Sequence, residues 1–490
     1  MRLLTKAVLC SLMGAAMLPA LTEAQTSTTA ASDPEGTLAQ LPVNAIGSPP
    51  SPLSPPLAPS PPAGFNGPLS SVGQALDNHG IDLGLVFLSP YVNSLSTGTS
   101  PGHSAIFGGL NFVAKVDLEK AVGIPNTTIN FHEVLNQPSY NTDKYLLQTA
   151  AAYQPFPVQT NNADLVRFTL SHDFFDKRLH VEYGRMNTSQ DFLVGTMCSQ
   201  CLMGALSMTV FTPGLTKSVW GAHTTFDLTP QWHLGLGIVE DNMANWQNHS
   251  GWDWSTSTRT GWIIFANAMY EDTFADTRYP AKAEFGLFRN TSPYKDPLYN
   301  TDGSSQALNS TGDPLMHTSG NWGLYAQGRK VVWRESGGGP VPRNLAVYGG
   351  ALVAPPSYNA YPLEAYTGVE YGGFFDNPVA LVGSTLRWIH LSGDRALYET
   401  ESRQAYTTML NAMSGGAVPI STEPTHRDNF AIDVHTQYGI LPGVMVGASA
   451  QYVIHPNQVI PLPATTPQRS GWIVGAFLLV DLGRLAGLSK

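Results

Sequence analysis

The sequence is poor in charged residues, and its basic residues are scattered. Only 13% of the 490 residues are Asp, Glu, Lys or Arg, against about 25% in an ordinary soluble domain. The 26 basic and 36 acidic residues leave a formal net charge of -10, and no Lys/Arg cluster is present. Such a cluster is needed to neutralise a row of phosphates. Nucleic-acid binding is therefore excluded.

Long apolar runs are also missing after the N-terminus. The run from Ala7 to Leu18 follows Arg2 and Lys6 and precedes the small-residue site Thr22-Glu23-Ala24. It is shorter than the roughly 20 residues that a membrane helix needs. A basic start, a short apolar run and a small-residue end are typical of a secretory signal. We expect residues 1–24 to be a cleaved signal peptide, with a signal anchor as the alternative, and we expect no helical membrane span.

Cysteine is scarce. Cys10 lies in the expected signal peptide, which leaves Cys198 and Cys201 in the mature chain. Two cysteines exclude a disulfide framework. Their CxxC spacing also occurs in redox motifs and in half of a zinc site, but no second CxxC and no neighbouring pair of histidines completes either. We expect a local structural disulfide and no metal site.

Motifs of catalysis are missing as well. The sequence has no GxSxG, no HExxH and no phosphate-cradling loop. His172-Asp173 falls in an expected short turn, where Asp more often forms an Asx turn than orients a catalytic base. The sequence predicts no enzyme, no catalytic residue and no cofactor.

What the sequence has in quantity is glycine and aromatic residues, with 47 Gly, 19 Tyr, 20 Phe and 10 Trp. After Leu69 these occur in runs of about ten residues in which apolar and polar residues alternate. From Phe430 to Val434, for example, every second residue is apolar or aromatic, and Asp433 and His435 fall on the other face. Polar residues on an interior face argue against a dry core. They fit a membrane barrel with one face to lipid and one to a lumen.

The alternation predicts sixteen strands, and about fourteen or eighteen strands are the alternative counts. The strands are 82–93, 108–118, 126–135, 164–172, 178–186, 217–227, 231–240, 261–270, 280–289, 320–333, 344–353, 363–373, 378–391, 428–438, 443–454 and 471–482. The links alternate in length. Long links are Asn136–Asp164, Asn187–Lys217, Asp241–Gly261, Asn290–Gly320 and Ser392–Asn429, and short links are His172–Arg178, Leu228–Gln231, Phe374–Pro378 and Ile440–Pro442. Outer-membrane barrels have short periplasmic turns and long outer loops. Residues 69–490 are therefore predicted to form an all-β, antiparallel transmembrane barrel.

Residues 25–68, between the expected signal and the barrel, include the Pro/Ser-rich stretch GSPPSPLSPPLAPSPP. Proline cannot donate to a β-ladder, so we expect an extended, polyproline-like periplasmic segment. Composition leaves open whether it is a plain spacer or also binds a partner.

Several segments between Gly80 and Gly483 resemble the OprB-type carbohydrate-selective porins in order and spacing. They are Gly80-Ile81-Asp82-Leu83, Gly108-Gly109, Asp117-Leu118-Glu119-Lys120, Tyr183-Gly184-Arg185, Asp191-Phe192, Trp220-Gly221, Pro442-Gly443, Gln451-Tyr452 and Pro456. The resemblance implies a sixteen-stranded barrel in the outer membrane of a Gram-negative bacterium that passes monosaccharides and other small uncharged solutes. Its partners would be sugars, outer-membrane lipid and the barrel assembly machinery, as a monomer or homotrimer. One departure is the C-terminus, which lacks a final aromatic residue, so the assembly signal is expected further inside, around Phe477.

The link Asn187–Lys217, which contains Asp191 and both mature cysteines, is expected to fold inward and narrow the pore, mainly on the strength of the resemblance. The alternative is an outward loop. Strand parity predicts that the following residues face the lumen: Lys115, Asp117, Arg167, Arg329, Arg387, Asp433, His435 and Gln437. Alternation places Arg185 and Glu133 with the lipid-facing set, where a mid-bilayer charge costs about 2–4 kcal/mol. We therefore expect both at a rim or constriction.

Three tryptophans, Trp246, Trp252 and Trp254, lie in the link NWQNHSGWDW. They are expected either to stack on sugars at the external mouth or to pack the loop and join the interfacial aromatic girdle. The leading functional hypothesis is passive, carbohydrate-selective diffusion without a cofactor. The alternatives are an outer-membrane barrel enzyme of lipase or deacylase type and a secreted adhesive β-protein.

Overall fold

The computed structural model describes most of the predicted barrel. The described residues are 67–98, 101–106, 108–136, 163–187, 197–198, 217–242, 251–336, 342–355, 359–416, 418–457 and 464–489. The expected signal peptide, residues 25–66 of the Pro/Ser-rich segment, Asp191, Cys201 and Trp246 lie outside them.

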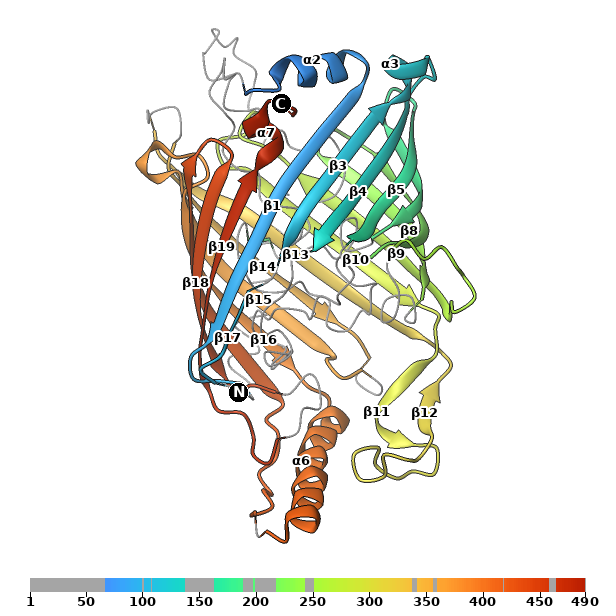
Figure 1. Ribbon diagram of the computed structural model, residues 1–490, viewed down its shortest axis with the longest axis vertical. Helices are drawn as coiled ribbons and strands as arrows, with labels where there is room; N and C mark the ends of the chain where they lie inside the picture. Colours follow the sequence, from blue (N-terminus) through green and yellow to red (C-terminus); the bar gives the residue numbers. More distant parts are fainter. Residues whose placement is uncertain are drawn as a thin grey trace.

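All described strands except β11 (Tyr294–Asn300) and β12 (Pro314–His317) form one antiparallel sheet that closes on itself as a barrel (Figure 1). Closure comes from β1 (Ile81–Ser94), which pairs with β19 (Gly471–Asp481). The short β2 (Ser104–Ile106) and β3 (Gly109–Asp117) both pair with β1 and together make one interrupted strand. The 17 strands of the sheet therefore make a barrel of 16. The predicted fold and strand number are confirmed.

The other barrel strands follow in chain order around the wall, and each pairs with its neighbours. They are β4 (Thr127–Asn136), β5 (Ala163–Phe174), β6 (Leu179–Met186), β7 (Val219–Asp227), β8 (Trp232–Asp241), β9 (Gly261–Glu271), β10 (Ala281–Asn290), β13 (Asn321–Arg334), β14 (Asn344–Val353), β15 (Leu363–Gly372), β16 (Leu381–His390), β17 (Asp428–Leu441) and β18 (Val444–Ile454). Each end lies within three residues of the predicted boundary.

The two ends of the barrel differ as the link lengths predict (Figure 1). At one end lie the short turns together with α2 (Ser70–Asn78) and α7 (Leu482–Ala486), which are joined by a hydrogen bond from Leu69 N to Ala486 O of 2.7 Å. The short α3 (Leu118–Val122) and the 3-10 turn η4 (Phe374–Asp376) are also in links of this end. Because short turns are periplasmic in bacterial barrels, this is the periplasmic end.

The opposite, extracellular end carries secondary structure that strand alternation did not predict. The link after β16 contains α6 (Gly393–Ser414), and the link after β10 contains a hairpin of β11 (Tyr294–Asn300) and β12 (Pro314–His317) (Figure 1). The first turn of α6 is capped by Ser392, whose Oγ accepts from Arg395 N at 3.1 Å. A side chain that accepts an orphan amide in this way is a common start of a helix. Among the described residues, no helix is both long enough and apolar enough to cross a membrane as a helix.

The wall of the barrel has the polarity expected for lipid outside and a polar lumen inside. On β17, Ile432 and Val434 are 42% and 53% exposed, whereas Asp433 and His435 are 0% and 2% exposed. A soluble sheet shows the opposite arrangement, with its apolar face buried. The face split predicted for this strand is confirmed.

We expect a charge on the outer face to destabilise the barrel in a bilayer. Leu236 is central on β8 and 54% exposed between the outward side chains of Leu234 and Ile238. Leu236→Arg should lower the free energy of unfolding by about 2–4 kcal/mol, because the guanidinium would enter hydrocarbon. The measurement is urea unfolding in lipid vesicles, and Leu228→Arg in the periplasmic turn is the control. Equal effects of the two substitutions would contradict the assigned lipid face.

Candidate functional site in the barrel lumen

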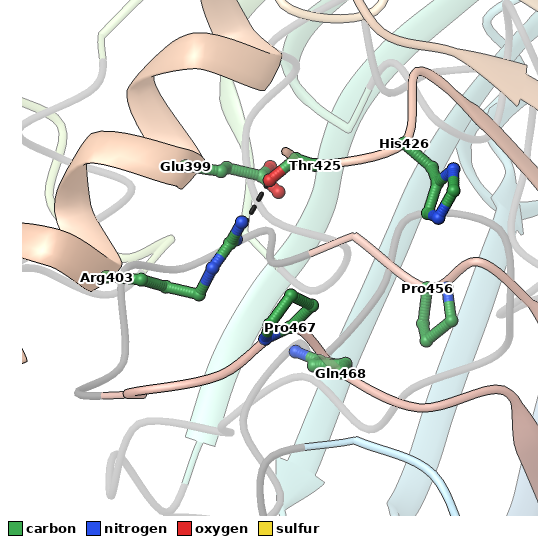
Figure 2. Close-up of a pocket in the computed structure, with 7 residues that line it drawn as sticks. All are labelled: Glu399, Arg403, Thr425, His426, Pro456, Pro467 and Gln468. Atoms are coloured by element: carbon green, nitrogen blue, oxygen red, sulfur yellow. Dashed lines mark hydrogen bonds between the residues drawn. The ribbon is translucent and has the colours of Figure 1, made fainter. Parts of the chain in front are cut away.

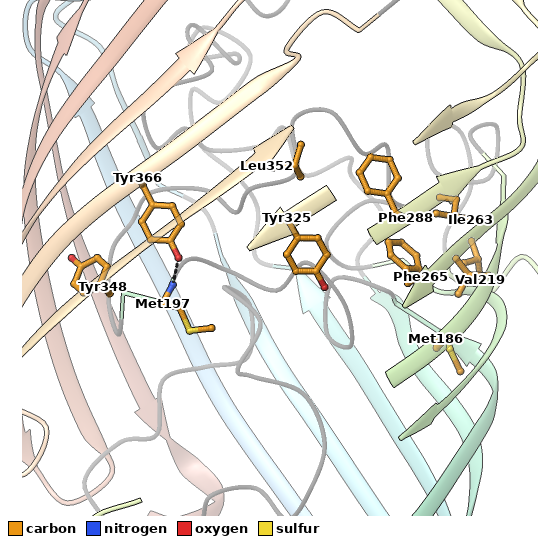
Figure 3. Packing of buried hydrophobic residues seen from close by; sticks show 11 residues of the cluster. Met186, Met197, Val219, Ile263, Phe265, Phe288, Tyr325, Tyr348, Leu352 and Tyr366 are labelled. Carbon is orange, nitrogen blue, oxygen red and sulfur yellow. Dashed lines mark hydrogen bonds between the residues drawn. The ribbon is translucent and has the colours of Figure 1, made fainter. Parts of the chain in front are cut away.

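Two described residues of the long link after β6 lie inside the barrel. Met197 N donates to Tyr366 Oη at 2.7 Å, and Met197 O accepts from Arg329 Nη1 at 3.2 Å. Cys198 Sγ lies 3.6 Å from His435 Nε2. Because these three wall residues are on inward faces, Met197 and Cys198 lie in the lumen, on the side expected for this link. Figure 3 shows Met197 beside Tyr366.

Met197 belongs to a cluster of buried side chains in which the rings of Tyr348 and Tyr366 lie beside it (Figure 3). The hydroxyl of Tyr325 donates to Glu284 at 2.7 Å, and that of Tyr366 donates to Gln327 Oε1 at 2.9 Å. Each ring therefore offers a flat apolar face and a polar tip with a fixed hydrogen bond. Alternation along a strand is enough to predict that these rings point inward. Only the structure shows which carboxylate and which amide accept the hydrogen bonds of their hydroxyl groups.

Charged residues on the same wall occur as pairs. Arg329 on β13 pairs with Glu370 on β15, and Arg387 on β16 pairs with Glu364 on β15 at 3.2 Å. Arg387 and Glu364 are 1% and 0% exposed. A buried charge is tolerated where an opposite charge and hydrogen bonds compensate its lost hydration. Sequence reasoning found the arginines but missed their glutamate partners, which both lie on β15.

Two further predicted lumen residues lie on β17, next to this wall. His435 Nδ1 is 2.6 Å from Asp433 Oδ1, and His435 Nε2 is 3.5 Å from Glu370 Oε1. Gln437, also inward by parity, donates from Nε2 to Val379 O at 2.8 Å. Together with the paired arginines, these side chains make one polar inner surface from β13 to β17.

The remaining predicted lumen residues lie on other strands. Arg167 on β5 faces inward and donates to both oxygens of Glu182 at 3.0 and 3.1 Å. Lys115 is in register with Asn130, whose amide reaches the inward Ser171. Asp117 was predicted in the lumen, but it ends β3 at the periplasmic end. Its carboxylate accepts from the first amides of α3, so it caps a helix.

Arg185 lies near the extracellular end of β6 and does not line the lumen. Arg185 is on the outward register of β6, opposite Trp220, yet it is 0% exposed. Its Nη2 donates to the carbonyls of Ser218, Gly251 and Asp253 at 2.6, 3.0 and 2.8 Å. Its Nη1 lies 3.5 Å from Glu240 Oε1. Backbone carbonyls and a carboxylate thus replace the water that an outward guanidinium loses.

The segment that supplies the carbonyls of Gly251 and Asp253, residues 251–255, is here called the outer-wall loop. Trp252 Nε1 in this loop donates to Glu133 Oε1 at 3.2 Å, so Glu133 also lies on the outer wall rather than in the pore. The ring centroids of Trp252 and Phe131 are 6.2 Å apart, and those of Trp254 and Phe168 are 6.1 Å apart. Trp252 and Trp254 therefore pack against the outside of the barrel, away from the lumen surface.

Within the part of the chain that the structure describes, two groups of side chains have the donor atoms of a metal site, with all donors of a group within 4.8 Å of one another. The first is His180, Glu182 and His223, and the second is Cys198, Glu370 and His435. Cys198 is disulfide-bonded, so its sulfur is not the thiolate that a metal requires. A disulfide at Cys198 was predicted; its expected partner, Cys201, lies outside the described residues.

A hollow at the extracellular end, between α6 and neighbouring links, is separate from the lumen surface (Figure 2). Arg403 Nη1 donates to Thr425 Oγ1 at 2.8 Å, and Arg403 Nη2 donates to Glu423 O at 3.0 Å. Burial lowers the pKa of the Arg403 guanidinium from its usual value. These bonds attach α6 to the link that follows it.

Comparison with known proteins gives one family and several similar structures. The family model "Carbohydrate-selective porin, OprB family" matches residues 104–474. Porin B of Pseudomonas aeruginosa is 22% identical over 301 residues, which are 60% of this chain and 64% of the relative, so the match spans less than two thirds of it. The high-pH structure of Pseudomonas putida OprB has a TM-score of 0.69 at 18% identity and covers 84% of this chain and 96% of that chain. The low-pH structure gives 0.50 at 12% identity, covering 87% and 99%.

We expect Arg185 to hold the outer-wall loop in place. Arg185→Gln should lower the free energy of unfolding by about 3–5 kcal/mol, because it removes one partner of a buried ion pair. Acrylamide should also quench Trp252 and Trp254 more strongly. The control is Arg178→Gln, since Arg178 also donates to carbonyls, of Asp227 and Leu228, but is exposed. If Arg178→Gln lost stability and Arg185→Gln did not, the proposed role of Arg185 would be contradicted.

Proposed function

Because the chain belongs to the carbohydrate-selective porin family OprB, we propose that it is an outer-membrane porin through which sugars diffuse passively. The observation that carries the proposal is the inner surface from β13 to β17 against which Met197 and Cys198 lie. Family membership favours a channel over the alternatives of a barrel enzyme and a secreted adhesive protein. No covalent step and no cofactor enters the proposed transport.

The chemistry of that surface suits a polyhydroxylated, uncharged solute. Sugar hydroxyls exchange hydrogen bonds with water for bonds with side chains, while the C–H faces of the ring stack on aromatic rings. Tyr348 and Tyr366 supply rings, and the Arg329–Glu370 pair supplies donors and acceptors side by side. Since each arginine is paired with a carboxylate, the surface is polar without a strong field of one sign.

We place the constriction at the level of Met197 and Cys198. Lining it on one side are Arg329, Arg387, Asp433, His435 and Gln437, and Asp191 belongs to the same inward link. Arg167 on β5 faces them across the lumen, because β5 and β15 are eight strands apart in a barrel of 16. Lys115 lies nearer the periplasmic end on β3.

The remaining parts of the chain complete the proposal. Residues 1–24 serve as the export signal, residues 25–68 as a periplasmic tether, and residues 69–490 as the barrel. The exposed apolar outer face supports contact with outer-membrane lipid. Insertion by the barrel assembly machinery, and a monomeric or trimeric state, are part of the proposal. Phe477 faces inward at 6% exposure, so an assembly signal at the last strand would use other aromatic residues such as the outward Trp472.

Ionic current through the purified protein in a planar bilayer tests the proposal. We expect stable conductance steps that glucose reduces. Tyr366→Phe should raise the conductance and weaken the effect of glucose severalfold, because its hydroxyl no longer holds Met197 N and Gln327. The control is Tyr371→Phe, on the outward face of the same strand. Silent bilayers, or glucose without effect on the wild type, would reject the proposed function.

Ion selectivity provides a second test of the inner surface. Arg329→Gln should leave Glu370 as an excess negative charge in the lumen and shift the reversal potential in a KCl gradient toward cation selectivity. Glu370→Gln should shift it toward anion selectivity, because Arg329 then lacks its partner. Lys330→Gln is the control. Lys330 is next to Arg329 on β13, but its amine donates to Tyr279 O, outside the lumen surface. Shifts of the same sign in both test variants would contradict the pairing.

A further inference from the structure

A second group of polar side chains lies in the lumen near the periplasmic end. His180 and Glu182 are two residues apart on β6, so they share its inward face. His223 on β7 is paired in register with Glu182. Glu182 Oε2 lies 3.0 Å from His223 Nε2 and 3.8 Å from His180 Nε2. The sheet register thus brings two imidazole nitrogens to one carboxylate oxygen.

A fourth side chain orients this group. His180 Nδ1 lies 2.8 Å from Asp173 Oδ1 on β5, a contact that fixes the ring proton on Nδ1. Nε2 is then the ring nitrogen that faces Glu182. A carboxylate on the far nitrogen of the ring is the usual partner of a metal-binding histidine, because it sets the tautomer and raises the basicity of the ligand.

The charges around Glu182 also favour a cation. Glu182 and Asp173 carry two negative charges, against one positive charge on Arg167. Thr169 Oγ1 donates to Glu182 Oε1, and Arg167 Nη1 donates to the same oxygen at 3.0 Å. Arg167 also reaches Oε2 at 3.1 Å. These donors hold the carboxylate in one orientation, with Oε2 on the side of the two histidines.

We propose that His180, Glu182 and His223 bind a divalent transition-metal ion of the Zn²⁺ class on the pore wall. Metal–ligand distances of about 2.0–2.2 Å place the donor atoms of a tetrahedral site about 3.3–3.6 Å apart. The observed 3.0 and 3.8 Å lie on either side of that range, so small side-chain movements suffice. Imidazole and carboxylate donors suit Zn²⁺, whereas Ca²⁺ and Mg²⁺ prefer oxygen ligands alone.

The site has an open side. The side chain of His180 is 22% exposed, while those of Glu182 and His223 are 4% and 5% exposed. Three protein ligands with a further position toward the lumen are typical of sites that exchange a ligand with solvent. His180 follows directly after Leu179, the first residue of β6 beyond a periplasmic turn. The bound ion would therefore add positive charge to the lumen wall at the periplasmic mouth.

Metal binding to the chelator-treated, detergent-purified full chain tests the proposal. Calorimetric titration with Zn²⁺ should show one site that is weakened in His223→Gln and in His180→Gln by more than the roughly 10–100-fold that loss of an outer-shell partner costs. Excess Mg²⁺ should not compete. The matched control is His233→Gln: His233 Nδ1 lies 2.6 Å from Asp227 Oδ1 in the same kind of pair, but among the described residues it belongs to no group of three donors. This control should bind as the wild type does.

Electron paramagnetic resonance of Cu²⁺ in the wild-type protein keeps the test independent of how well the variants fold. The expected spectrum shows two coordinated nitrogens, and that of His223→Gln one. Three results would each overturn the proposal. They are a wild-type spectrum without nitrogen coordination, an equal Zn²⁺ affinity in the wild type and the three variants, and displacement of Zn²⁺ by excess Mg²⁺. Glu182 would then serve only as the ionic partner of Arg167 and the histidines. The proposal of sugar passage is tested separately, by conductance, and does not depend on whether a metal binds.

Discussion

Closure of the sheet by hydrogen bonds between β1 and β19 is the constraint on which the rest of the structure depends. In the register from Val86–Asp481 to Ser94–Ile473, the first and last strands satisfy each other's backbone groups. Lipid offers no replacement for such bonds, so a sheet with an open edge is not stable in a membrane. A closed sheet also has a fixed inside and outside. The direction of each side chain, to lipid or to the lumen, then follows from its position along a strand.

Within that frame, the polar groups of the wall are compensated in two ways. Inside, charges are paired between neighbouring strands, as in Arg387 with Glu364 and Arg167 with Glu182. Outside, the outward Arg185 is covered by the outer-wall loop, whose carbonyls accept hydrogen bonds from its guanidinium. Two polar surfaces result, one on β5 to β7 and one on β13 to β17. The first has the donors of a metal site, and the second receives the inward link at Met197.

The sequence predicts the strands well because lipid and lumen impose a two-residue period on each of them. It predicts the links poorly, since α6 and the β11–β12 hairpin lie where no such period applies. Arg185 was recognised as an anomaly in the alternation, but its partners at Gly251 and Asp253 are 66 and 68 residues away along the chain. Likewise, the spacing of His180 and Glu182 is visible in the sequence, whereas the approach of His223 depends on strand register.

The central claim is that the inward link and the paired charges of the inner wall form a passage for uncharged sugars. Swelling of liposomes that contain the purified protein tests it most directly, with a panel of monosaccharides compared with ions of similar size. The account predicts fast entry of monosaccharides and slower entry of the ions. Equal entry of sugars and ions of the same size would contradict it, because the passage would then discriminate by size alone.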